Sequence, residues 1–129
     1  MDGAGMSLVV YAKDVPRVSA FYAAVLGVSA EHPDPTYAVL DGDHWQLVVQ
    51  AIPPAYADEI TIGDPPELRE DTPVKPVFPV SRIAAAREQA AAHGGGIAAP
   101  DREWTFRRSL RCDGFDPEGN VLQLSQPVP

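Results

Sequence analysis

Two glutamines stand at the centres of stretches that otherwise have the pattern of apolar strands, Gln46 in WQLVVQ and Gln123 in VLQLSQ. Burying a polar side chain without a partner costs about 1–3 kcal/mol, so each amide must face a cavity, a partner or solvent. Polar residues at the middle of two strands are awkward in a core but natural in the lining of a binding cavity. We therefore predict that both amides line a cavity. The alternative is an amide that is exposed or satisfied internally.

Few other residues could carry chemistry. Lys75 is the one candidate for acid–base work, provided that desolvation lowers the pKa of its amine. His32 is predicted in a loop, His44 in a turn and His93 at a helix end, all on the surface. Cys112 is predicted to be a small buried residue and not a nucleophile. The sequence contains neither an HExxH motif nor a glycine-rich nucleotide fingerprint.

Composition narrows the class of protein. The net charge of −8, from 10 basic and 18 acidic residues, argues against nucleic acid as a partner, and it serves solubility or attracts a cationic ligand. No apolar run approaches the roughly 20 residues that cross a bilayer, and the start MDGAGMSLVV lacks the regions of a signal peptide. The single cysteine excludes an internal disulfide. We expect a cytoplasmic protein without a membrane partner.

The elements that position these residues follow from capping and periodicity. In the first half, Asp14 as N-cap, an early Pro16 and a C-terminal Gly27 delimit a helix at 15–26. In the second half, Ser81 is predicted to cap a helix at 82–93 that ends at the glycines 94–96. Strands are predicted at 7–12, 36–40, 45–50, 74–80, 105–112 and 121–125.

The order of these elements repeats. Val10 matches Phe78 and Ala12 matches Val80 at one constant offset, whereas Gln46 matches Gln123 at a longer one. Such internal similarity indicates duplication, with a longer loop in the second copy. We predict one domain over residues 1–129, made of a first module at 1–52, a Pro-rich acidic linker at 53–73 and a second module at 74–129.

Three stretches in this order resemble the vicinal oxygen chelate superfamily, which includes glyoxalase I, bleomycin-resistance proteins and extradiol dioxygenases. They are VVYAKDVPRVSAFYAAVLGVS, VFPVSRIAAAREQAAAHGGGIAAP and DGFDPEGNVLQLSQ. The resemblance implies an α+β fold, the glyoxalase/bleomycin-resistance/dioxygenase fold, in which two tandem βαβββ modules form a cup-shaped curved mixed sheet. In members that use a metal, His or Glu side chains at four strand positions hold a divalent ion in the cup.

Aligned on these motifs, the four positions fall on Ser7, Gln46, Lys75 and Gln123. Neutral amides, a hydroxyl and an ammonium are poor ligands for a divalent cation, which needs carboxylates or imidazoles. We therefore predict no metal and no cofactor. This departure puts the metal-dependent activities of the family in doubt.

The predicted ligand-binding residues of the cup comprise those four positions and three neighbours: Ser7, Tyr11, Gln46, Val48, Lys75, Trp104 and Gln123. The first hypothesis is a metal-independent protein that binds a small organic molecule, acts as a homodimer and sequesters an antibiotic or metabolite, as in antibiotic resistance. The second is a lyase, isomerase or dioxygenase that uses a non-standard site, with Lys75 as its acid–base group. The third is an interaction module with a filled cup.

Overall fold

The computed structural model describes residues 5–128, so the outer ends of the two predicted modules, residues 1–4 and 129, lie outside the described part. The first half comprises β1 (Met6–Ala12), α1 (Val15–Leu26), β2 (Ala30–Asp34), β3 (Tyr37–Asp41) and β4 (Trp45–Ala51). A connecting segment carries the short α2 (Pro54–Ala57). The second half comprises β5 (Val77–Pro79), α3 (Ile83–Ala92), β6 (Gly96–Ile97), a 3-10 turn at Pro100–Arg102, β7 (Trp104–Phe106), β8 (Ser109–Phe115) and β9 (Val121–Pro127).

The strands form two mixed sheets with matching topology. The first has the order β1-β4-β3-β2, and the second has the order β5-β9-β8-β6, with β7 paired to β8. In each sheet the first strand of the half is parallel to the last, and the last is antiparallel to the strand before it. The predicted α+β fold is therefore confirmed, with its strands hydrogen-bonded in two sheets.

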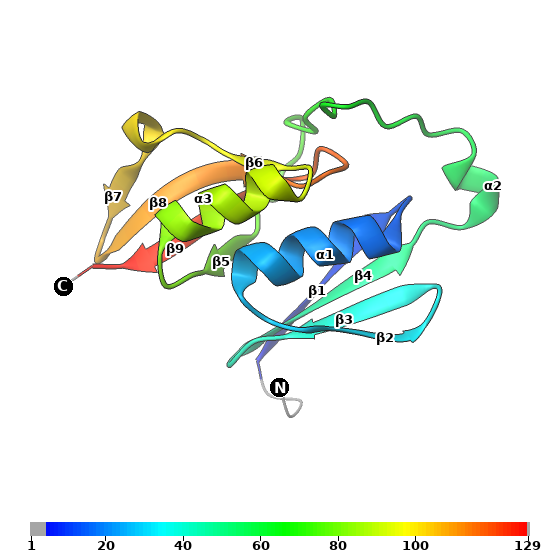
Figure 1. Cartoon of the computed structure of the whole chain (residues 1–129), viewed down its shortest axis with the longest axis horizontal. Coiled ribbons are helices and arrows are strands. Elements are labelled where there is room, and N and C mark those ends of the chain that lie inside the picture. Colours follow the sequence, from blue (N-terminus) through cyan, green and yellow to red (C-terminus); the bar gives the residue numbers. More distant parts are fainter. Residues whose placement is uncertain (1–4, 129) are drawn as a thin grey trace.

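Helices α1 and α3 pack against the two sheets, and together they enclose one hydrophobic core. Figure 1 shows α1 lying over the first sheet and α3 over the second, with the helices side by side at the centre. Leu47 and Val49 of β4 and Leu122 and Leu124 of β9 are fully buried, because alternate strand residues point toward the helices. The helices contribute Val15, Val18, Phe21, Tyr22 and Val25 from α1 and Ile83, Ala86 and Ala90 from α3.

Helix α1 has the predicted bounds. The Asp14 carboxylate accepts a hydrogen bond from the backbone N–H of Arg17 at 3.1 Å, and Gly27 ends the helix at φ 68°. Helix α3 begins differently from the prediction. Its N-cap is Arg82 and not Ser81, and the side-chain oxygen of Gln126 accepts from the Ile83 N–H at 2.8 Å. A residue from the last strand thus replaces the local cap.

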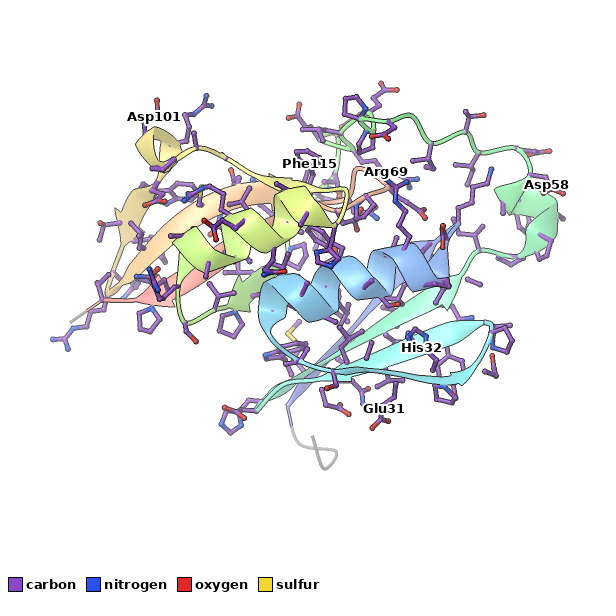
Figure 2. The ribbon with its side chains drawn as sticks, in the orientation of Figure 1. Glu31, His32, Asp58, Arg69, Asp101 and Phe115 are labelled. Carbon is purple, nitrogen blue, oxygen red and sulfur yellow. The ribbon has the colours of Figure 1, made fainter. Side chains whose placement is uncertain are left out.

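Three further expectations about local structure are wrong. The predicted strand at 105–112 is a hairpin, in which β7 and β8 are separated by a turn at Arg107 with φ 53°. The predicted strand at 74–80 shrinks to the three residues of β5, whose prolines limit its pairing. His32 lies in the edge strand β2 and not in a loop (Figure 2).

The turn after β8 locks the two halves together. Asp116 and Glu118, in the DPEGN motif, are buried, and Gly119 adopts φ 85° at the close approach of the Glu67 carbonyl. Glu118 accepts from the backbone N–H groups of Lys13 at 2.7 Å and Asp14 at 2.8 Å, immediately before α1. The motif therefore has a structural role, because it holds the start of α1 from the second half of the chain.

Asp116 gathers hydrogen bonds inside the core. Its carboxylate accepts from the Tyr22 hydroxyl at 2.8 Å, from the Asn120 side chain at 2.9 Å and from the Glu118 N–H at 2.9 Å. Burial raises the pKa of Asp116 above its ordinary value, and these bonds oppose the shift. Burial, followed by the charge of Asp116, raises the pKa of Tyr22 well above its ordinary value.

Over residues 5–128, none of the helices has the length and apolarity that crossing a bilayer requires.

Candidate functional site

Each sheet has one face against the helices and one face turned away from them, which we call the open face. Ser7, Val9 and Tyr11 alternate along β1 on this face, and Val9 and Tyr11 are exposed. Val48 lies beside Val9 across the β1–β4 ladder and Tyr11 lies beside Gln50. Side chains alternate between the two faces along β4 and β9, because Leu47, Val49, Leu122 and Leu124 are buried while Gln46 and Gln123 are not.

The first half carries a row of hydrogen-bonded polar groups on its open face. The Ser7 hydroxyl donates to the side-chain oxygen of Gln46 at 3.1 Å. The side-chain nitrogen of Gln46 donates to the carboxylate of Asp41 at 3.2 Å. The three residues lie in register on β1, β4 and β3. The amide of Gln46 is thus held in one orientation by a partner on either side.

The second half repeats this arrangement around Gln123 and extends it. The side-chain nitrogen of Gln123 donates to Asp113 at 3.1 Å, while its oxygen accepts from Arg111 at 2.9 Å. The Lys75 ammonium lies 3.2 Å from the other oxygen of Asp113. Arg111 also donates to the Ser109 hydroxyl at 2.8 Å. We call Lys75, Arg111, Asp113 and Gln123 the second-half cluster.

The seven predicted site residues therefore fall into two groups on the open faces. Ser7, Gln46, Val48 and Tyr11 share the first sheet, and Ser7 contacts Gln46 directly. Lys75 and Gln123 meet through Asp113 in the second half. Trp104 lies beside Arg111 in the β7–β8 ladder and keeps 40% of its surface exposed.

Two cavities adjoin these groups. One of about 600 Å³ lies next to Lys75, Asp113, Phe115 and Val121. A second of about 420 Å³ lies at the β1 edge, between Val9 and Tyr11 on one side and the segment 71–76 on the other. The connecting segment returns to the second half at Arg69 (Figure 2), which forms a parallel bridge with Asn120. Both volumes are in the range of small-molecule sites, about 300–1,000 Å³.

Sequence reasoning missed Asp41, Asp113 and Arg111. The signal for the two carboxylates was present, because an Asp-Gly pair precedes the glutamine strand in both halves, at residues 41–42 and 113–114. The signal for Arg111 was hidden, because a continuous strand at 105–112 gave no sign of the hairpin that brings β7 against β8. Since Ser109, Arg111 and Asp113 alternate along β8, they share the open face.

Lys75 does not lie at the strand position, in register with Gln123, that the alignment on the motifs gave it. It precedes β5, and the residue in register with Gln123 is Val77, whereas Ser7 is in register with Gln46. The Lys75 side chain is 41% exposed and its ammonium is paired with a carboxylate. These surroundings supply little of the desolvation on which an acid–base role would depend.

The donor chemistry does not fit the divalent-ion site that the fold family implies. Ser7, Gln46 and Gln123 carry a hydroxyl and two amides, the residue in register with Gln123 is the apolar Val77, and both amide groups are engaged with aspartates. Throughout residues 5–128, no group of three or more His, Cys, Asp and Glu side chains is placed to hold a metal ion. Lys75 would add repulsion toward a cation at this place.

The remaining reactive residues lie apart from the open face. His44 is in the turn before β4, and Nδ1 of His93 contacts the carbonyl of Gln89 at the end of α3. Cys112 is fully buried on the helix side of β8, where burial raises the pKa of its thiol. Its Sγ lies 3.8 Å from Arg87, which pairs with Glu103. This arrangement favours an inert, protonated thiol.

Comparison with known proteins agrees with this fold. Residues 7–125 match the family of the glyoxalase-like domain. A search of curated proteins finds no significant match. A glyoxalase/bleomycin resistance protein/dioxygenase family enzyme from Burkholderia phytofirmans PsJN is similar in structure, with a TM-score of 0.65, 19% identity and coverage of 95% of this chain and 97% of that one.

Two further solved structures show the same likeness. A glyoxalase-related enzyme from Fulvimarina pelagi has a TM-score of 0.66 and 14% identity, over 98% of this chain and 88% of that one. TioX from Micromonospora sp. ML1 has a TM-score of 0.65 and 17% identity, over 98% of this chain and 100% of that one. At these identities the likeness establishes the fold alone.

Proposed function

Because the chain belongs to the glyoxalase-like domain family, we propose that it is a metal-independent protein that binds a small organic molecule on its open face. Sequestration of an antibiotic or metabolite is the form of binding that this proposal favours. Solved structures described as glyoxalase/bleomycin resistance proteins, from Albidiferax ferrireducens T118 and Catenulispora acidiphila DSM 44928, share the fold. The ligand-binding residues that we propose are Ser7, Tyr11, Gln46, Val48, Lys75, Trp104 and Gln123.

The observation that carries the proposal is the pair of oriented amides on the open face. Gln46 and Gln123 are each held by an aspartate and one further partner, and neither is buried. Fixed polar groups beside apolar side chains are the features that orient a small guest. The cavity of about 600 Å³ is lined by Lys75 and Asp113, the second of which holds the Gln123 amide. A neutral guest or an anion suits these groups better than a cationic metal ion does, for the reasons of donor chemistry given above.

The same face favours a homodimer. Five apolar side chains on the open faces keep between 40% and 59% of their surfaces exposed: Val9, Tyr11, Val77, Trp104 and Phe106. Exposed apolar side chains concentrated on one face mark a contact surface for a guest or a partner. Sedimentation equilibrium at micromolar concentration tests this point, since a monomer at every concentration would count against the homodimer. We also propose a cytoplasmic location, which suits the free Cys112.

A thermal-shift screen of the full chain against metabolites and antibiotics tests the binding proposal. A ligand that stabilises the folded state raises the melting temperature by mass action. We expect at least one hit whose shift is lost in Tyr11→Ala, because Tyr11 is 59% exposed on the open face of β1. Tyr56→Ala is the matched control, since Tyr56 is 66% exposed on α2. Hits that respond equally to both variants would overturn the assignment of the site.

A further inference from the structure

Three contacts orient the side chain of Arg111 on the open face of the second sheet. Its Nε donates to the Ser109 hydroxyl at 2.8 Å, and one terminal nitrogen donates to Gln123 at 2.9 Å. The guanidinium carbon lies 5.0 Å from the centre of the Phe106 ring, and the Ser109 hydroxyl donates to the Phe106 carbonyl at 2.7 Å. The guanidinium is therefore fixed before any ligand arrives.

The two hydrogen-bond acceptors of Arg111 are both uncharged. A guanidinium has five N–H donors, and the hydroxyl of Ser109 and the amide of Gln123 use two of them. Within residues 5–128 no carboxylate forms an ion pair with Arg111, which is half-buried, and such an arginine is suited to binding a ligand's anionic group through two parallel hydrogen bonds.

The arginine has no counterpart at the equivalent position of the first half. In the first half, Asp41 and Gln46 pair as Asp113 and Gln123 do, yet the residue two positions before Asp41 is Val39. An apolar side chain at that place is therefore compatible with an aspartate–glutamine pair. In the first half Ser7 donates to the glutamine oxygen, whereas in the second half Val77 stands at that register and Arg111 is the donor, so one N–H of Arg111 supports the amide. The N–H groups of Arg111 beyond those used by Gln123 and Ser109 are not needed for this support.

The neighbouring charges decide which anion fits. Asp113 would repel an incoming anion, but the Lys75 ammonium at 3.2 Å offsets its charge. The net charge of Lys75, Arg111 and Asp113 is +1, which favours a ligand with one negative charge over a phosphate monoester with two. Trp104 and Phe106, 40% and 49% exposed, flank Arg111 with aromatic surface. The site is thus suited to a carboxylate attached to an apolar or aromatic group.

We propose that Arg111 anchors the carboxylate of a small aromatic or apolar monocarboxylic acid on the open face, beside Phe106 and Trp104. This inference rests on the proposed function and adds the chemical class of the ligand. It differs from the cationic ligand that the overall acidity of the chain would attract, because the local balance at the second-half cluster is two cations to one carboxylate. The local charge, at contact distance, outweighs the screened charge of the distant surface.

The test compares four probes that share one ring system. Calorimetric titration of the full chain uses 1-naphthoate, its uncharged carboxamide, 1-naphthylmethylamine and 1-naphthyl phosphate. We expect naphthoate to bind about tenfold or more tightly than the carboxamide, since charge-assisted bidentate pairs are the strong ones. We also expect its affinity to fall as salt rises.

Variants locate the effect. Arg111→Gln should weaken naphthoate binding about tenfold and leave the carboxamide unchanged, and Arg111→Lys should restore part of the loss. Arg108→Gln removes the same charge from an exposed position on the β7–β8 turn and should change neither affinity by more than about twofold. Thermal unfolding of each variant confirms that it is folded.

The outcomes separate the two proposals. If the amine or the carboxamide binds more tightly than naphthoate, or if Arg111→Gln leaves naphthoate binding unchanged, the monocarboxylate assignment is overturned while small-molecule binding stands. Tighter binding of naphthyl phosphate would likewise overturn the preference for a single charge. If none of the four probes binds, the monocarboxylate assignment fails. The proposed function then stands if the thermal-shift screen gives a hit, and it fails too if the screen gives none.

Discussion

Replacing Glu118 with glutamine should loosen the contact between the two halves of the chain. Glu118 is only 3% exposed, and its two side-chain oxygens accept hydrogen bonds from the backbone N–H groups of Lys13 and Asp14. Glutamine keeps one accepting oxygen but turns an NH₂ group toward the other N–H. It also removes a negative charge beside the start of α1, where the helix dipole favours one.

The magnitude follows from these contacts. A hydrogen bond to a charged group contributes about 1.5–3 kcal/mol, and a buried donor left without an acceptor costs about 1–3 kcal/mol. We therefore expect Glu118→Gln to lower the free energy of unfolding by about 3 kcal/mol, a large part of the roughly 5–15 kcal/mol of an ordinary domain. Urea unfolding, followed by circular dichroism at neutral pH, measures the difference.

The control is Glu88→Gln, which makes the same charge change at an exposed position of α3. A surface substitution of this kind should change the free energy of unfolding by less than about 0.5 kcal/mol. If Glu118→Gln were as mild as the control, the assignment of the DPEGN turn as the lock between the halves would be refuted.

Three further predictions concern the core. Because the pKa of Tyr22 is raised, its hydroxyl stays protonated in the folded state while the unfolded chain ionises, so stability that is present below pH about 10 should be lost above it. Tyr22→Phe, which removes the bond to Asp116, should lower stability at neutral pH by about 1–2 kcal/mol but flatten this alkaline loss in pH-dependent urea melts. Gln126→Ala should lower the free energy of unfolding by about 0.5–2 kcal/mol, because the Ile83 N–H loses its capping acceptor; an unchanged urea midpoint would contradict that role. Cys112 should resist a thiol reagent at pH 8 until urea unfolds the chain, and rapid labelling of the folded protein would show that the thiol is not buried.

The sequence predicts those elements whose signals are local. The bounds of α1 follow from Asp14, Pro16 and Gly27, which act within one turn of the helix ends. The buried and open faces of β4 and β9 follow from a period of two. The start of α3 could not be predicted in the same way, because its capping oxygen comes from Gln126, far along the chain.

The candidate site was predictable in part. Gln46 and Gln123 were found because a polar residue interrupts an apolar strand, and both do lie on the open face. The cluster around Gln123 was missed because the β7–β8 turn has Arg107 at positive φ, where glycine or asparagine would be the usual signal. Without that turn, Arg111 had no defined neighbours. An Asp-Gly pair before each glutamine strand marked Asp41 and Asp113 in the sequence, but their pairing with the glutamines depends on strand register, which a short motif does not specify.

Native mass spectrometry of the full chain, purified without chelator and incubated with the hits of the ligand screen, tests the central claim most directly. The measurement gives the mass of whatever the folded protein holds. We predict an added mass equal to that of the organic ligand, one per chain, with no added metal, and loss of that mass in Gln46→Leu or Gln123→Leu. A stoichiometric zinc, iron, nickel or manganese ion on the wild-type chain, released by the same two substitutions, would contradict the claim.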